Sequence, residues 1–280
     1  MMRTDGLTYG IKSLLDRAAV PLYKARLRPF SPGYETTKRR IIESAIDKGV
    51  LLDERDLPVG YGIAMDERVV EYPWLFGRLK SVGKMLDAGS TFNHDFLLTR
   101  PPLKGADLTI MTLAPEKRCY WHLGCSYVFG DLRRTYFADG AFDTIASIST
   151  IEHIGLDNTM LYTSASECAE SDEYGFVPAV KEFRRIIRPG GTCFITVPFG
   201  KRDNFGWYQV FDSAKIDATV EAFRPTSYQI DYFGYAANGW SRRDPVLLSN
   251  ATAYDVHTGR GWHFDRAASS RAIACLQLNA

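Results

Sequence analysis

The sequence predicts an α/β fold in which helices cover both faces of a parallel sheet. From residue 84 onward, short apolar runs alternate with helical stretches. The stretch 176–188 carries one apolar stripe, and Pro189-Gly190-Gly191 ends it. The 280 residues are 45% hydrophobic and 24% charged, which is typical of a globular chain with one large domain or two small ones.

Residues 1–80 have the pattern of helices and are expected to form an N-terminal cap or extension. Apolar residues recur at helical spacing in three segments, 7–22, 36–46 and 66–79. Pro21 ends or kinks the first segment, Thr36 and Thr37 can cap the second, and Pro73 interrupts the third. A sheet-containing domain is predicted to follow at 81–280.

The sheet domain contains alternating strand and helix patterns. Strands are predicted at 84–88, 107–112, 127–129, 143–149, 192–197, 227–233 and 272–278. A further helix is expected from Ser213 to about Phe223. Ligands of parallel sheets bind outside the carboxyl ends of the strands. We therefore expect the site to be lined by residues just after Ala88, Thr112, Phe129, Ser149 and Val197.

Charge and cysteine content exclude several classes of protein. The net charge of +1 argues against a strongly basic nucleic-acid-binding protein, so no nucleic-acid partner is expected. The five cysteines are odd in number and lack the spacing of a disulfide framework or a zinc site. No segment has the length or hydrophobicity of a signal peptide or a membrane span. These features predict a cytoplasmic location.

The chemistry-bearing motifs occur in a defined order. Asp87-Ala88-Gly89 ends the first strand, and Gly130-Asp131-Leu132-Arg133 follows the third. Residues 137–144 (FADGAFDT) lead into the fourth strand, which is followed by 149–155 (STIEHIG). Residues 182–191 (EFRRIIRPGG) precede a strand that ends in Val197-Pro198. This succession resembles the class I, Rossmann-like methyltransferases that use S-adenosylmethionine.

The resemblance implies a Rossmann-like sheet of seven mostly parallel strands, with the last strand, near 272–278, inserted antiparallel. It implies a methyltransferase domain at 81–280, with an aromatic-rich insertion at about 199–262. It also implies S-adenosylmethionine as cofactor and S-adenosylhomocysteine as product.

The same resemblance assigns roles to individual residues. Asp87, Gly89 and Ser90 match the first cofactor-binding motif, in which Thr91 and Asn93 replace further glycines. Asp131 matches the residue that meets the adenine amino group, and Leu132 would lie against the ring. Ser149 and Thr150 would lie beside the reacting sulfonium. At the second strand, Thr112 replaces the usual acidic ribose-binding residue, and Glu116 can reach back from the loop.

His153 is the candidate general base, because an imidazole can take a proton from a hydroxyl as the methyl moves. The alternative is that it only packs against or caps the following helix. Glu152 can orient His153, bind substrate, or hydrogen-bond the backbone. Asn158 can bind polar substrate groups or cap a turn. The histidines show no metal-binding spacing, and no divalent metal is expected.

Aromatic side chains concentrate at 199–240, where 42 residues include 11 aromatics. Trp207 and Tyr208, with Arg202 nearby, suit a sugar or another polar ring, although core packing explains part of the run. The segments EHIGLDN and FGWYQVFDS resemble methyltransferases of bacterial surface-polysaccharide pathways.

The favoured function is methyl transfer to a hydroxyl of a sugar, nucleotide sugar or glycan intermediate. The alternatives are N- or C-methylation in secondary metabolism or lipid, and a non-catalytic binding module that kept the fold. The expected partner is therefore a small-molecule or glycan substrate. The oligomeric state stays open, with a homodimer among the alternatives.

Overall fold

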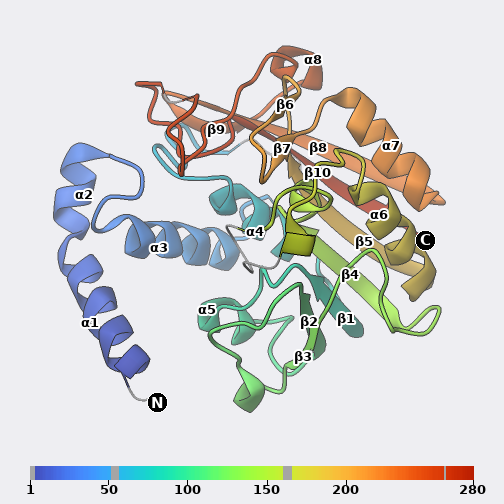
Figure 1. The fold of residues 1–280 in the computed structure, drawn as a ribbon. Helices are drawn as coiled ribbons and strands as arrows, with labels where there is room; N and C mark the ends of the chain where they lie inside the picture. The colour runs from blue at the N-terminus through green and yellow to red at the C-terminus, as the bar shows by residue number, and fades with distance from the viewer. Residues whose placement is uncertain (1–3, 52–56, 160–165, 262) are drawn as a thin grey trace. The chain divides into compact units, whose positions relative to one another are not determined.

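The computed structural model describes residues 4–51, 57–159, 166–261 and 263–280 (Figure 1). The predicted cap (1–80) and the predicted insertion (199–262) therefore include some residues outside these ranges. The chain divides into two compact units. The first unit comprises 1–77, 233–242 and 253–271, and the second comprises 78–232, 243–252 and 272–280.

The first unit is mainly helical. It contains α1 (Thr4–Ala18), α2 (Val20–Arg26), α3 (Tyr34–Asp47) and α4 (Arg68–Phe76). Helix α3 begins at Tyr34, so the expected capping by Thr36 or Thr37 is wrong. The carboxylate of Asp16, in α1, accepts hydrogen bonds from the backbone N–H groups of Gly33 (2.6 Å) and Thr36 (2.7 Å). The first turn of α3 is thus satisfied from a neighbouring helix.

The second unit contains the parallel part of the sheet, built from β1 (Lys84–Ala88), β2 (Asp107–Thr112), β3 (Ser126–Phe129), β4 (Phe142–Ile148) and β5 (Ile187–Pro198). Strand β1 pairs in parallel with β2 and β4, β2 with β3, and β4 with β5. Strand β10 (Ala272–Asn279) pairs antiparallel with β5, as the resemblance implied for the last strand. The strand order, β3-β2-β1-β4-β5-β10-β8-β9, is that of an α/β Rossmann-like sheet.

Over the residues that the structure describes, the sheet has eight strands, so the expectation of seven is wrong. The additional strand is β9 (Gly239–Arg242), which forms an antiparallel hairpin with β8 (Ser227–Ala236). Ala237 and Asn238 make the connection, and Gly239 follows with φ of 96°. A short connection of this kind with Gly in the left-handed region is a hairpin signal that the strand pattern alone does not reveal.

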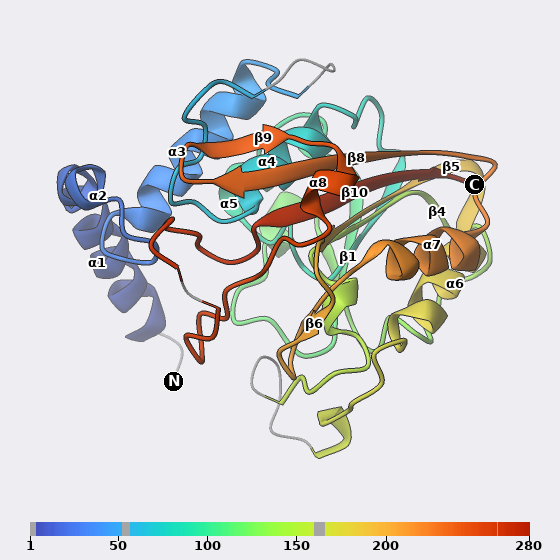
Figure 2. The ribbon, with the colours of Figure 1, turned by 90° about the horizontal axis from the view of Figure 1, so that it is seen from above.

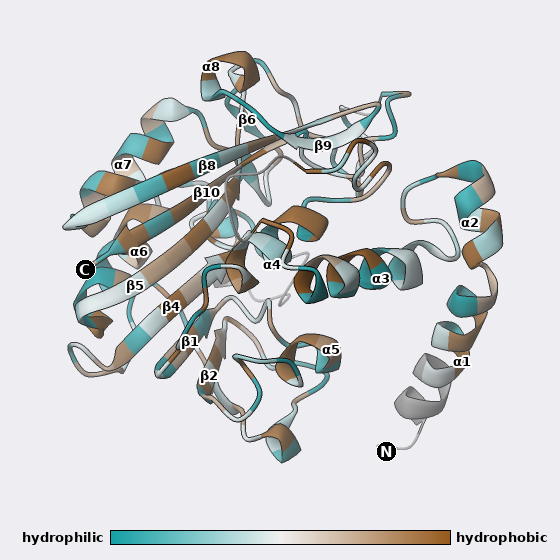
Figure 3. Ribbon diagram, turned by 180° about the vertical axis from the view of Figure 1, so that it is seen from behind, coloured by the Kyte–Doolittle hydropathy of each residue, from teal (hydrophilic) through white to brown (hydrophobic). Residues whose placement is uncertain are grey.

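Two helices, α6 (Phe176–Ile186) and α7 (Ser213–Phe223), pack against one another beside the sheet (Figure 2). Phe176, Val180 and Phe183 of α6 are fully buried in one core with residues of β4, β5 and β10. These strands are correspondingly rich in hydrophobic residues (Figure 3). Helix α6 ends at Ile186, two residues before the predicted end, because Ile187 already pairs with Phe142 in the sheet.

Shorter elements complete the second unit. The short helices are α5 (Asp95–Leu98), α8 (Pro245–Leu248) and the 3-10 turns η1 (Trp121–Leu123), η2 (Ile151–His153) and η3 (Ser166–Cys168). A small antiparallel pair, β6 (Asp203–Asn204) and β7 (Gln209–Val210), forms a separate hairpin after β5. Among the described residues, no helix is long and apolar enough to cross a membrane.

Candidate functional site

The turn after β1 is organised by Asp87, which is fully buried. One carboxylate oxygen accepts from the backbone N–H (3.1 Å) and the hydroxyl (3.0 Å) of Thr91, and the other accepts from the N–H of Phe92 (2.7 Å). Asp87 and Thr91 therefore shape the turn.

Gly89 brings this turn against the end of β4. Its φ is 128°, and a Cβ at this position would overlap the side chain of Thr150. The next residue, Ser90, donates a hydrogen bond to Glu116 in the loop after β2. Asn93 accepts from the Tyr127 hydroxyl (2.7 Å) and donates to the backbone of the same loop. Ser90 and Asn93 thus connect the β1 turn to its neighbours.

Gly89→Ala is expected to lower the free energy of unfolding by about 2–5 kcal/mol, because backbone strain and overpacking add. Urea unfolding measures the effect. Gly130→Ala is the matched control, because Gly130 lacks a positive φ and a Cβ there would lie an ordinary 3.4 Å from Met111. Equal unfolding midpoints for the two variants would contradict this interpretation.

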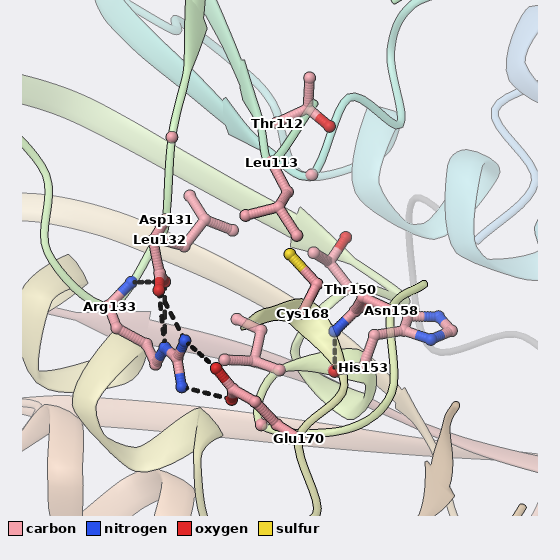
Figure 4. A pocket seen from close by; sticks show the side chains of 14 residues that line it. Thr112, Leu113, Asp131, Leu132, Arg133, Thr150, His153, Asn158, Cys168 and Glu170 are labelled. Carbon is pink, nitrogen blue, oxygen red and sulfur yellow. Dashed lines mark hydrogen bonds and ion pairs between the residues drawn. The ribbon is translucent and has the colours of Figure 1, made fainter. Parts of the chain in front are cut away.

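The carboxyl ends of four strands meet at one cavity of about 230 Å³ (Figure 4). Gly89 follows β1, Thr112 ends β2, Asp131 follows β3 and Thr150 follows β4. The remaining lining residues are Leu113, Gly130, Leu132, Arg133, His153, Ile154, Gly155, Asn158, Cys168 and Glu170.

Among the predicted cofactor residues, Gly89, Thr112, Asp131, Leu132 and Thr150 line this cavity. Asp87, Ser90, Thr91, Asn93 and Ser149 lie outside its lining. The backbone N–H of Ser149 donates to Thr196 in β5, which holds the end of β4 in place.

One side of the cavity carries a hydrogen-bonded ion cluster. The Arg133 guanidinium donates to Asp131 (2.7 and 2.9 Å) and, through two nitrogens, to Glu170 (2.6 and 2.7 Å). These hydrogen bonds, with Glu170 first, raise the pKa of Arg133 above its usual range. Two carboxylates and one guanidinium leave this side with a net charge of about −1, which favours a cationic or hydrogen-bond-donating ligand.

His153 lies on the other side of the cavity from this cluster (Figure 4). Its Nδ1 is 2.8 Å from the backbone carbonyl of Trp207, so Nδ1 carries the hydrogen and Nε2 is left to accept a proton. The His153 and Trp207 rings stack at 5.2 Å with 22° between their planes. Nε2 lies 3.9 Å from the carboxylate of buried Glu152.

Asn158 holds the segment that carries His153. Its amide donates to the backbone carbonyls of His153 (3.0 Å) and Leu156 (2.9 Å). The side chain is 9% exposed and lines the cavity.

The structure brings Trp207 and Tyr208 to His153 but does not bring Arg202 there. The Tyr208 ring lies 6.2 Å from that of His153 and stacks on Phe205. Arg202 is half-exposed and pairs with Glu173 at 2.7 Å. Neither aromatic residue nor Arg202 belongs to the cavity lining.

A second polar network is centred on Glu173. The carboxylate of Glu173 accepts from Lys215 (2.9 Å), Asn204 (3.1 Å) and Arg202. These bonds lower the pKa of Glu173 to about 2. Lys215 is fully buried, and its ammonium also donates to Gln209. The network links the segment before α6, the β6–β7 hairpin and α7.

The sequence patterns missed most of these supporting residues. Glu170, Cys168 and Glu173 lie between β4 and α6, where neither a strand nor a helix was predicted. Arg133 forms an ion pair that also lines the cavity. Its position two residues after Asp131, beyond a strand end, was the only available signal.

In the described part of the chain, no group of three or more His, Cys, Asp or Glu side chains is arranged to hold a metal ion.

No family model matches the chain, and no curated protein matches it. Solved structures do show similarity. The 1,6-didemethyltoxoflavin-N1-methyltransferase of Burkholderia thailandensis, which has bound S-adenosylhomocysteine, is 13% identical, with 89% of this chain and 90% of that chain covered and a TM-score of 0.44. The N-methyltransferase NodS of Bradyrhizobium japonicum is also 13% identical (71% and 86% covered, TM-score 0.41).

The cyclase SpnF is 14% identical, with 72% of this chain and 76% of that chain covered and a TM-score of 0.40. Similarities at this level assign no activity and no residue role. The fold assignment rests on the strand order of the chain itself.

Proposed function

We propose that the chain is an S-adenosylmethionine-dependent methyltransferase that acts on a hydroxyl of a small polar acceptor, such as a sugar, nucleotide sugar or glycan intermediate. One observation carries the proposal: residues at the ends of β1, β2, β3 and β4 line a single cavity, with His153 on the opposite side of it from the Asp131 cluster. In parallel α/β sheets this edge is the ligand-binding edge.

The cavity residues fit the nucleoside part of S-adenosylmethionine. Leu113, Leu132 and Ile154 offer apolar surface for a flat ring, and Asp131 offers an acceptor for an amino group. Thr112 offers a hydroxyl at the end of β2, and the net negative charge suits a cationic cofactor. The volume of about 230 Å³ lies below the roughly 300–1,000 Å³ of most ligand sites. The cavity is therefore large enough to hold a part of the cofactor and not the whole of it.

When bound, the cofactor supplies a methyl group on a positively charged sulfur. The chain has to orient the acceptor and remove its proton. We assign proton removal to Nε2 of His153, because Nδ1 is held by the Trp207 carbonyl. The nearby Glu152 carboxylate would stabilise the imidazolium. Trp207 would form the acceptor surface, whereas Tyr208 is 4% exposed and packs on Phe205, and Arg202 pairs with Glu173, so neither has an evident part in it.

The cap role of the helices at 1–80 and the cytoplasmic location stay predictions.

Calorimetric titration tests the cofactor assignment. Both S-adenosylmethionine and S-adenosylhomocysteine are expected to bind with a Kd between roughly 1 µM and 1 mM, the range in which the KM values of enzymes usually fall. Asp131→Ala should weaken binding by about 10–100-fold, because it removes a charged acceptor. Asp139→Ala is the matched control, because Asp139 pairs with Arg185 at the surface. No binding of either compound would refute the proposal.

A further inference from the structure

The outward side of α1 is apolar. Ile11, Leu14 and Leu15 lie at helical spacing, and their exposed fractions are 51%, 65% and 64%. Asp16 of α1 accepts hydrogen bonds from the N-terminus of α3. Leu14 lies about 200° around α1 from Asp16. Helix α1 is therefore attached to α3 through Asp16, whereas Ile11, Leu14 and Leu15 keep half or more of their surface exposed.

The exposed surface extends beyond the helix. Leu15 and Phe30 line one shallow hollow of about 510 Å³, whose other lining residues are Lys12, Asp16, Ser31, Pro32, Tyr34 and Glu35. Phe30 is 48% exposed. We call Ile11, Leu14, Leu15 and Phe30 the α1 patch. Monomeric proteins rarely expose contiguous apolar patches larger than a few hundred Å², and larger ones mark interaction sites.

The same segment concentrates positive charge. Residues 10–30 contain five basic side chains and one acidic side chain, a net charge of +4, whereas the whole chain has +1. All five basic side chains are exposed: Lys12, Arg17, Lys24, Arg26 and Arg28. The single acidic residue, Asp16, is engaged with the backbone of α3. The segment that carries most of the α1 patch therefore has an excess of positive charge, with Lys12 and the acidic Glu35 both lining the hollow beside Leu15.

We propose that the α1 patch binds a membrane surface that contains anionic lipid headgroups. Leucine, isoleucine and phenylalanine can enter the headgroup–acyl boundary while lysine and arginine meet the phosphates and carboxylates. A second copy of the chain fits less well, because it would bring the same positive charge. A stable protein interface also takes roughly 20–30 residues from each partner, far more than this patch offers.

Vesicle co-sedimentation of the full chain tests the proposal. We expect the chain to bind vesicles of phosphatidylcholine that contain roughly 30% phosphatidylserine. Binding to vesicles of pure phosphatidylcholine should be at least about tenfold weaker, and binding to the anionic vesicles should fall as the salt concentration is raised. Leu14→Asp combined with Leu15→Asp should reduce binding by at least about tenfold. Arg17→Glu combined with Lys24→Glu should reduce it by a similar factor, and only for the anionic vesicles.

Leu247→Asp is the matched control, because Leu247 is 74% exposed on α8 and lies outside the α1 patch. It should bind vesicles like the unaltered chain. Circular dichroism establishes that each variant is folded. Absence of vesicle binding, or equal loss in the Leu247 control, would overturn the proposal. So would a concentration-dependent dimer that the Leu14 and Leu15 substitutions dissociate, because a second copy would then occupy the patch. Cofactor binding is measured separately, so this test does not depend on the proposed enzymatic function.

Discussion

His153→Ala is expected to lower kcat for methyl transfer by about 10²–10⁴-fold, the usual contribution of a general base. The affinity for S-adenosylhomocysteine should stay within about twofold, because His153 lies across the cavity from Asp131 and its Nδ1 is hydrogen-bonded to the Trp207 carbonyl. Acceptors are first found by screening sugars and nucleotide sugars for the mass gain of one methyl group. Turnover and calorimetry then separate catalysis from binding.

His122→Ala is the matched control, because His122 is an exposed residue of η1 and does not line the cavity. Its turnover should equal that of the unaltered chain. If His153→Ala also retained full turnover, His153 could not be the base. An acceptor that loses its proton without help, such as an amine, would then be favoured, and the O-methylation assignment would fail.

Glu173→Ala is expected to lower the free energy of unfolding by about 3–5 kcal/mol, because it leaves the fully buried Lys215 without its carboxylate partner. Burial lowers the pKa of Lys215 although Glu173 raises it, so the carboxylate offsets only part of the desolvation of the ammonium. Urea unfolding of both proteins measures the difference.

Two further substitutions control for the partners of Glu173. Arg202→Ala should cost only about 0–1 kcal/mol, because that side chain is half-exposed. Lys215→Met should be far less harmful than Glu173→Ala, because it removes the buried charge and leaves Glu173 bonded to Arg202 and Asn204. Equal losses for Glu173→Ala and Arg202→Ala would contradict this account.

The lowered pKa of Glu173 also predicts a pH dependence. Its folded-state pKa of about 2 lies below the ordinary value of 4.5, so its ionised form stabilises the fold above about pH 4.5. This contribution is lost as the pH falls from 4.5 toward 2. Glu173→Gln removes the titrating group, and its free energy of unfolding should therefore fall less steeply over that range than that of the unaltered chain.

Much of the sheet could be predicted because its signals are local. The apolar stripe of α6 appears in the sequence as spacing, and the five parallel strands appear as short apolar runs. The position of the cavity followed from these strands, because the ligand-binding edge of a parallel sheet is a property of its topology. The hairpin that adds β9 was missed because a four-residue strand has too little pattern to detect.

The roles of individual residues depended on contacts that spacing does not reveal. Asp87 has the expected position at the end of β1, yet its carboxylate closes the turn by accepting backbone hydrogen bonds from residues four and five positions later. Arg202 has the expected chemistry for a polar acceptor, yet it pairs with Glu173.

The sequence by itself determined the order of strands and helices and the edge of the sheet at which a ligand would bind. It could do so because the spacing of apolar residues along a short segment shows which side of a helix or strand is buried. Only the tertiary structure decided which side chains meet there. Arg133 and Glu170 are 37 residues apart, Glu173 and Lys215 are 42 apart, and His153 and Trp207 are 54 apart. Apart from Lys215, which lies in α7, these residues belong to loops and short turns without a periodic pattern, and their pairs hold the proposed base and the charged side of the cavity in place.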